Sequence, residues 1–249
     1  MNIIVFDTET TSLEKPFVYN IGYTIFDTDD NKIIVKKDFV IEQIWHNLPL
    51  FSSAYYADKR PIYVNRMRSR KVKLAKFGQV TQEIIRDINN FEIVGGYAYN
   101  SPFDEKVFNF NCDWFKCSNP FDLISVFDVR GYVHKTIAFT DDFKMFCETN
   151  KYFTEAGNYS TTAETLFRYI TKNLEFSEEH TALADSEIET EILKKCVELG
   201  AEYNTEYKVY RSIPRKVDKE LNIYINGELS DTYTFTKRTN RGDNIYLTD

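Results

Sequence analysis

Short runs of β-branched and aromatic residues, concentrated in the first half of the chain, predict the strands of a sheet. Residues 3–6 are continuously apolar, which is typical of a strand buried on both faces. The polar turn 27–31 interrupts the next apolar stretch and predicts a meander. The expected strands span residues 3–6, 18–26, 32–41, 91–97 and 121–126, the last being either a strand or a strand–helix transition.

Apolar residues at helical spacing predict helices between and after these strands. The expected helices span residues 81–88, 104–110, 161–173 and 185–199. In the last of them, Ile188, Ile192 and Cys196 lie on one face. Pro102 suits the start of the helix expected around 104–110. This order predicts an α/β fold with a mixed five-stranded sheet flanked by helices.

After residue 204 the pattern changes to an alternation of apolar and polar positions. Residues 221–236 alternate in this way around the dipeptide Asn226-Gly227, which is a strong signal for a β-hairpin. We therefore expect residues 1–204 to form the main domain and residues 205–249 to form a small C-terminal β-hairpin appendage.

Composition excludes several classes of protein. Of the 249 residues, 43% are apolar, which favours a folded core over disorder. No stretch approaches the roughly 18 apolar residues of a membrane helix, and no signal-peptide pattern opens the chain, so we expect a cytoplasmic protein without a membrane partner. The four cysteines form no CxxC pair, and the three histidines are too few to favour a Cys/His zinc site.

The net charge is −7, yet positive charge is concentrated in one segment. Residues 45–78 show no clean period, and we expect them to form a long basic excursion with some helix. Residues 59–76 hold eight Lys and Arg side chains without an acidic one. Tyr55 and Tyr56 lie beside them, and such a mixture suits a single strand, whose bases stack on rings while its phosphates pair with cations. The alternative is a solvated loop. The arginines expected to contact substrate are Arg66, Arg68 and Arg70.

Three carboxylate-bearing motifs lie at the ends of expected strands or the starts of expected helices, where functional side chains gather in such sheets. They are Asp7-Thr8-Glu9, Asn100-Ser-Pro-Phe103-Asp104 and His180-Thr-Ala-Leu-Ala-Asp185. Two-residue spacing on an extended segment points the side chains of Asp7 and Glu9 to the same face. Each motif alone is also typical of a surface turn, a helix start or a solvated loop. Together they describe oxygen ligands for two divalent metals beside a histidine, which suits hydrolysis of a phosphodiester.

In order and separation, these motifs resemble the three exonuclease motifs of the DEDD superfamily. The histidine selects its DEDDh (DnaQ-like) branch, because the sister branch carries a tyrosine in the third motif. The resemblance covers about residues 1–200 and implies a ribonuclease H-like fold. It further implies that two divalent ions, Mg²⁺ or Mn²⁺, bind Asp7, Glu9, Asp104 and Asp185, and that His180 is the general base.

The resemblance also implies a place for the terminal nucleotide. Thr8 is expected to contact it, and Leu13 to wedge against its base. Asn100 and Phe103 are expected to shape the second motif, with Phe103 either part of the core or stacked on substrate.

We therefore expect a metal-dependent 3′→5′ exonuclease that releases nucleoside 5′-monophosphates from DNA, preferably single-stranded; direction and product come from the resemblance. An exoribonuclease or oligonucleotide nuclease of the same superfamily is the first alternative, because the sequence does not separate the two sugars. The second is a nuclease-like binding module that acts through the hairpin, against which the intact carboxylate set argues. Proofreading in DNA replication or repair would require a polymerase or another protein in trans.

Overall fold

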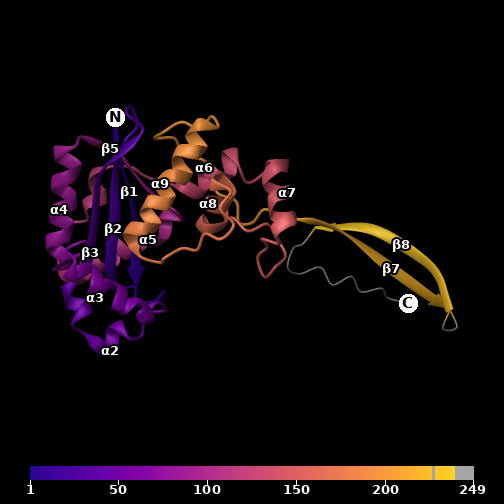
Figure 1. The fold of residues 1–249 in the computed structure, drawn as a ribbon, viewed down its shortest axis with the longest axis horizontal. Coiled ribbons are helices and arrows are strands. Elements are labelled where there is room, and N and C mark those ends of the chain that lie inside the picture. Colours follow the sequence, from indigo (N-terminus) through magenta and orange to yellow (C-terminus); the bar gives the residue numbers. More distant parts are fainter. Residues whose placement is uncertain (226–227, 239–249) are drawn as a thin grey trace.

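The computed structural model describes residues 1–225 and 228–238, with backbone only from residue 216 onwards. Its centre is a six-stranded mixed sheet in the order β4-β3-β2-β1-β5-β6 (Figure 1). The strands are β1 (Asn2–Thr10), β2 (Val18–Asp27), β3 (Lys32–Ile41), β4 (Lys73–Ala75), β5 (Ile93–Ala98) and β6 (Val126–Asp128). β1, β2 and β3 form the antiparallel meander, and the remaining pairings are parallel.

The predicted α/β class and mixed sheet are confirmed, with one strand more than expected. The extra strand, β4, has three residues, which is too short to show a period. The segment expected at 121–126 divides into a short 3₁₀ helix, Pro120–Leu123, and the start of β6.

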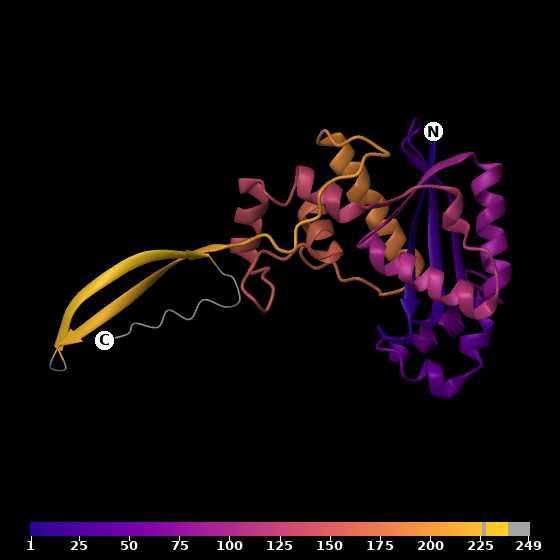
Figure 2. The same cartoon turned by 180° about the vertical axis from the view of Figure 1, so that it is seen from behind.

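Helices cover both faces of the sheet (Figures 1 and 2). They are α1 (Glu42–Trp45), α2 (Leu48–Phe51), α3 (Arg60–Arg68), α4 (Phe77–Asn90), α5 (Ser101–Phe115), α6 (Val129–Thr136), α7 (Asp141–Asn150), α8 (Ala163–Thr171) and α9 (Ala182–Glu198). The four expected helices correspond to α4, α5, α8 and α9, whereas α6 and α7 were not predicted. Among the described residues, no helix combines the length and apolar content needed to cross a membrane.

Strand β1 explains why residues 3–6 are apolar without a break. Ile4 and Phe6 pack into one core with α4 and α5, whereas Ile3 and Val5 pack into a second core with α6, α8 and α9. Side chains alternate along a strand, so a central strand with helices on both faces must be apolar at every position. The same alternation directs Asp7 and Glu9 to the face that α9 covers.

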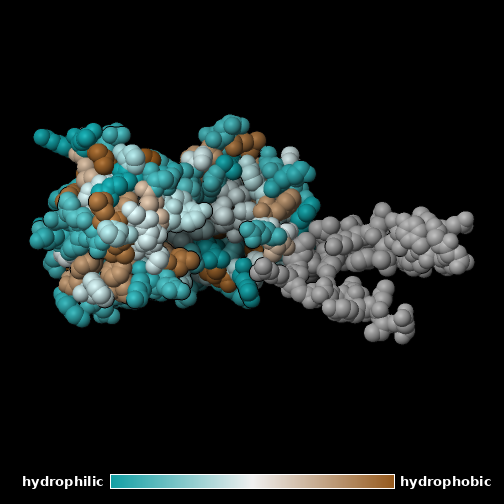
Figure 3. All heavy atoms as spheres, turned by 90° about the horizontal axis from the view of Figure 1, so that it is seen from below, coloured by the Kyte–Doolittle hydropathy of each residue, from teal (hydrophilic) through white to brown (hydrophobic). Residues whose placement is uncertain are grey.

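The segment 45–78 is folded rather than a solvated loop. It contributes α2, α3 and the 3₁₀ helix Ala57–Lys59, which lie beyond the carboxyl end of β1 (Figure 1). Its aromatic side chains Trp45, Phe51 and Tyr63 are buried in the first core. Figure 3 shows the molecule from this end, where polar and apolar side chains are mixed over the surface.

The C-terminal part of the chain first crosses the main body and then leaves it. The Tyr210 backbone N–H donates to Nδ1 of His134 on α6 over 3.0 Å, and the Thr205 backbone N–H donates to the hydroxyl of Tyr132 over 3.2 Å. Strands β7 (Lys216–Ile225) and β8 (Glu228–Arg238) then form the predicted antiparallel hairpin (Figures 1 and 2). The expected turn at 226–227 lies outside the described residues. The predicted boundary at residue 204 stays a prediction.

Candidate active site

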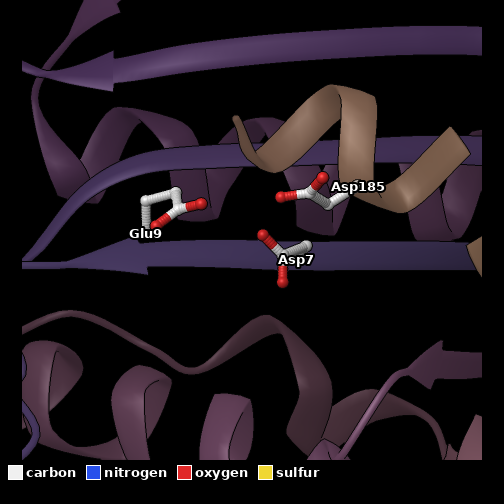
Figure 4. A group of neighbouring side chains, drawn as sticks. All are labelled: Asp7, Glu9 and Asp185. Atoms are coloured by element: carbon white, nitrogen blue, oxygen red, sulfur yellow. The ribbon is translucent and has the colours of Figure 1, made fainter. Parts of the chain in front are cut away.

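Three of the predicted carboxylates meet at the end of the central strand. Asp7 and Glu9 project from β1 and Asp185 from the first turn of α9 (Figure 4). One ligand oxygen from each lies within 4.8 Å of the other two. The two residues of β1 share a face because of their spacing, and α9 brings the third group from elsewhere in the chain.

A glycine on β2 allows α9 to come this close. Gly22 pairs directly with Asp7 across the sheet. A Cβ atom at this position would lie 2.0 Å from the backbone nitrogen of Leu183, so no side chain fits there. The Ala182 backbone N–H also donates to Oδ1 of Asn20 on β2 over 2.8 Å. The start of α9 is thus fixed against the backbone of β2, which places Asp185 beside Asp7.

The fourth predicted carboxylate, Asp104, lies next to this group. It comes from the first turn of α5 and is 2% exposed. The hydroxyl of Thr8 donates to its Oδ1 over 2.6 Å, so Thr8 orients an acidic side chain in this structure. Burial, followed by the negative charge of Asp7, raises the pKa of Asp104 well above its usual range.

Burial also governs the ionisation of the other three carboxyl groups. It raises the pKa of Asp7 to about 7, that of Asp185 to about 9 and that of Glu9 to about 10, with neighbouring carboxylates adding to each shift. Without a cation, Glu9 and Asp185 therefore hold protons near neutral pH, and Asp7 is partly protonated. Oδ1 of Asp185 is buried and has no hydrogen-bond partner. Converging oxygen ligands with an unpartnered buried oxygen fit a hard divalent cation.

Two further acidic residues belong to this environment and were missed in the sequence. Glu189 lies four residues after Asp185 on α9, is buried, and accepts a hydrogen bond from the Tyr99 backbone N–H over 3.1 Å. Its helical spacing from Asp185 is the signal that could have indicated it. Glu178 lies two residues before His180, and burial raises its pKa to about 7. No spacing rule indicates Glu178, because its segment is irregular.

His180 lies in the irregular segment between α8 and α9. Its backbone has a φ of 55°, and its side chain is 30% exposed. Nδ1 lies 3.7 Å from the Glu178 carboxylate, and the imidazole stacks on the ring of Tyr56, with centroids 4.5 Å apart and planes 11° apart. Burial, and then the charge of Lys59, lowers the pKa of His180. The imidazole is therefore neutral at physiological pH and able to accept a proton.

A groove of about 300 Å³ opens beside the carboxylates. Its walls come from the end of β1, the loop that follows, the start of α5 and the segment 45–78. The lining residues are Thr8, Glu9, Thr10, Thr11, Ser12, Leu13, Tyr55, Tyr56 and Phe103. Three of the predicted substrate-binding residues therefore share one groove. Leu13 and Tyr55 are largely exposed, at 73% and 87%, as apolar surfaces available to a ligand would be.

The other predicted substrate-binding residues lie outside this groove. Asn100 adopts a left-handed backbone before α5, and its Oδ1 accepts a hydrogen bond from Arg130 over 2.9 Å. Arg66 pairs within the protein, with Nη2 2.6 Å from the Glu179 carboxylate. Arg68 and Arg70 are exposed.

No family model matches the sequence, and no curated protein matches it. Among solved structures, a 3′-exonuclease studied for recognition of the histone mRNA stem-loop has a TM-score of 0.52 at 13% identity, over 81% of this chain and 83% of that one. The nuclease domain of 3′hExo, a DEDDh family member bound to rAMP, has a TM-score of 0.48 at 13% identity, over 85% and 97%. E. coli Exonuclease I with a dA16 oligonucleotide has a TM-score of 0.47 at 14% identity, over 80% and 41%.

The chain thus spans about two fifths of the length of Exonuclease I. The first of these likenesses, together with the mixed sheet covered on both faces, shows that the chain has the fold of a 3′-exonuclease. The fold expected from the three motifs is therefore confirmed.

Proposed function

We propose that this protein is a metal-dependent 3′→5′ exonuclease that hydrolyses phosphodiester bonds at DNA 3′ ends, preferably single-stranded, and releases nucleoside 5′-monophosphates. The observation that carries the proposal is the meeting of Asp7, Glu9 and Asp185 within 4.8 Å, with an unpartnered buried oxygen on Asp185. A groove lies beside them, and it is lined by Glu9 and by Tyr56, the ring on which His180 stacks. A module that only binds nucleic acid has no use for converging buried carboxylates, which are costly to bury without a cation.

The four carboxylates Asp7, Glu9, Asp104 and Asp185 would hold two divalent ions, Mg²⁺ or Mn²⁺. Such ions, when bound, supply an activated water and stabilise the departing 3′ oxygen. His180 acts as the general base and accepts a proton from the attacking water, because its imidazole is neutral at working pH. Thr8 holds Asp104 in place through its hydroxyl, so its contribution is orientation of a ligand.

The groove binds the terminal nucleotide. Leu13, Phe103 and Tyr55 offer apolar and aromatic surface on which a base packs or stacks. Arg68 and Arg70 are exposed on and just after α3, where they pair with phosphates further along a single strand. Asn100 acts indirectly, by shaping the start of α5 that carries Asp104.

RNA is the second candidate substrate. The 3′-exonuclease with a TM-score of 0.52 was studied for its recognition of the histone mRNA stem-loop. Exonuclease I, with a TM-score of 0.47, was solved with a DNA oligonucleotide. A role in DNA replication or repair, with a polymerase or another protein as partner, and a cytoplasmic location are part of the same proposal.

One assay tests activity, direction and sugar together. The chain is incubated with 5′-labelled single-stranded DNA, duplex DNA and RNA, each with Mg²⁺, Mn²⁺ or EDTA, and Asp7→Asn serves as the inactive control. We expect a descending ladder on single-stranded DNA with either metal and none with EDTA. A ladder on RNA alone would select the second candidate, and intact substrates under every condition would refute the nuclease proposal.

A further inference from the structure

The segment 45–78 contacts the residues on both sides of His180 as well as His180 itself. Nη2 of Arg66 lies 2.6 Å from Oε2 of Glu179, and Nη1 of Arg66 donates to the hydroxyl of Thr181 over 3.0 Å. The imidazole of His180 stacks on the ring of Tyr56. Three consecutive residues are therefore held by two side chains that come from a distant part of the chain.

Arg66 is itself anchored to the sheet. Its Nη1 lies 3.4 Å from Oδ2 of Asp38 on β3, and Asp38 also accepts a hydrogen bond from Nδ2 of Asn20 on β2 over 2.6 Å. Oδ1 of Asn20 accepts a hydrogen bond from the hydroxyl of Tyr63, which lies one turn before Arg66 on α3, over 3.0 Å. This network is buried or half-buried, so its polar contacts are strong and directional. Arg66 therefore joins a fixed part of the sheet to the segment that carries the histidine.

Backbone structure does not fix His180 by itself. Residues 172–181 contain neither a helix nor a strand, and His180 adopts a left-handed backbone that is uncommon for a residue with a side chain. A general base must nevertheless lie within hydrogen-bond reach of the proton it removes. Side chains from outside the segment must then supply the order that the backbone lacks.

We propose that Tyr56 and Arg66 are positioning residues for His180, so that the segment 45–78 aligns the general base in addition to any contact with substrate. The inference rests on the proposed role of His180 as the base. Tyr56 sets the plane of the imidazole, and Arg66 sets the path of the backbone on either side of it. The segment 45–78 thus has two separate roles. Arg66 faces inwards and positions His180, whereas Arg68 faces solvent and binds phosphate.

Measurements of kcat and KM distinguish positioning of His180 by Arg66 from binding of a substrate phosphate by Arg66. A positioning residue acts on the chemical step, so Arg66→Ala should lower kcat about tenfold or more with little change in KM. Arg68→Ala should instead raise KM and spare kcat at saturating substrate. Arg86→Ala on α4, which removes an exposed arginine paired with Glu83, is the matched control and should change neither.

Glu179→Gln distinguishes phosphate binding by Arg66 from positioning of His180, because the first role predicts a change in KM and the second a change in kcat. This change leaves Arg66 in place and removes the negative charge of its partner, whose side chain is 43% exposed. If Arg66 binds phosphate, its release should lower KM. If Arg66 positions His180, kcat should fall, and the loss should largely disappear in the His180→Ala background. A lower KM with unchanged kcat would overturn the positioning role, and so would a full kcat loss that persists without His180.

The stack on Tyr56 has a spectroscopic readout that needs no activity. The chain has three histidines, so imidazole proton resonances can be assigned by the loss of one signal in His180→Ala. In the metal-free protein, the His180 signal should be shifted upfield by the ring of Tyr56. Tyr56→Ala should abolish that shift and lower kcat. Tyr56→Phe keeps an aromatic ring, so it should retain the shift and the wild-type kcat. An unchanged His180 signal in Tyr56→Ala would overturn the stack.

The same signal separates failure of this inference from failure of the proposed function. A wild-type chain that shows the shifted resonance and cleaves no nucleic acid would refute the nuclease proposal, and with it a catalytic purpose for the stack. An active chain without the shift would refute the role of Tyr56 alone.

Discussion

The carboxylates and the histidine of the candidate site are held in place by different means. The carboxylates project from β1 and from the first turns of α5 and α9, and the backbone of these elements fixes them. His180 lies on an irregular segment and depends on side-chain contacts with Tyr56 and Arg66. The proposed metal ligands are therefore held by the backbone of the sheet and its helices, whereas the proposed base is held by side-chain contacts with the segment 45–78. On this proposal, we expect changes in that segment to alter turnover without disturbing the carboxylates.

The largest effect is expected at the centre of the carboxylate group. Asp7→Asn should abolish nearly all cleavage, because the group loses a charged ligand at its core. The fold should persist, and the metal-free melting temperature should be equal or higher, because one buried carboxyl with a raised pKa is removed. Cleavage assays and thermal melts check this expectation. Near wild-type turnover would show that the metal ligands lie elsewhere.

The next effect concerns the histidine. His180→Ala should lower turnover about 10²–10⁴-fold, the usual contribution of a general base, while metal binding is retained. Because the pKa of His180 is lowered, the acidic limb of the wild-type rate profile should lie below pH 6.5 and should change in the variant. Rates measured across pH and metal titrations by calorimetry check both points. An unaltered rate and profile would leave this histidine with a structural role only.

Gly22→Ala tests whether close backbone contact fixes the carboxylates. The added Cβ would lie 2.0 Å from the Leu183 nitrogen, so α9 must move, and a destabilisation of about 1–3 kcal/mol is expected together with a loss of activity. Gly78→Ala is the matched control, because its Cβ would meet only Cys117 at 3.8 Å. That change lies in α4 and should be neutral or stabilising. Chemical denaturation of both variants measures the difference, and equal stabilities would contradict the account of Gly22.

A smaller effect is expected from Arg68 and Arg70, which are proposed to bind single-stranded nucleic acid, whereas Arg66 is proposed to position His180. If Arg68 and Arg70 each contact a phosphate of a single strand, their joint replacement by alanine should flatten the slope of log affinity against log salt by up to about 1.4. Turnover on saturating substrate should be retained. Binding measured at several salt concentrations checks this expectation. An unchanged slope would move the search for phosphate contacts to another surface.

The smallest expected effect is on the pH dependence of stability, and it comes from His134, which lies on α6 and serves as a reference for His180. Burial lowers the pKa of His134 to about 4, whereas an exposed histidine has one of about 6.5. The folded chain therefore binds fewer protons than the unfolded chain between these values, and stability falls as pH falls through that window. His134→Gln cannot titrate, so its stability should fall less from pH 7 to pH 5. Urea unfolding of both proteins at the two pH values measures this, and parallel losses would contradict the shift.

The sequence was informative where local pattern and tertiary contact agree. The unbroken apolar run 3–6 predicts a central strand, and the spacing of Asp7 and Glu9 predicts a shared face. The short strands β4 and β6, with three residues each, leave no period to detect. Helix α6 was missed, and the element that it contacts most is the distant α9. Helix α7 was missed although Thr140 caps its start, which is a signal present in the sequence.

The same reasoning explains the result at the site. The four predicted carboxylates lie on regular elements, where a strand end or a helix start determines where a side chain lies. Glu189 was missed on such an element, although its spacing from Asp185 is a usable signal. Tyr56 and Glu178 come from irregular segments, and their contacts depend on how distant parts of the chain pack. Arg66 was predicted from its charge alone, and charge does not distinguish a side chain that pairs within the protein from one that faces solvent.

The left-handed backbone at His180 has a consequence for the balance between stability and activity. With a φ of 55°, this position favours glycine, which adopts such a conformation without the steric cost that other residues bear. A glycine there should yield a chain at least as stable as the wild type that lacks the proposed base. If His180 is the base, the conformational strain at this position is the cost of placing a reactive group there.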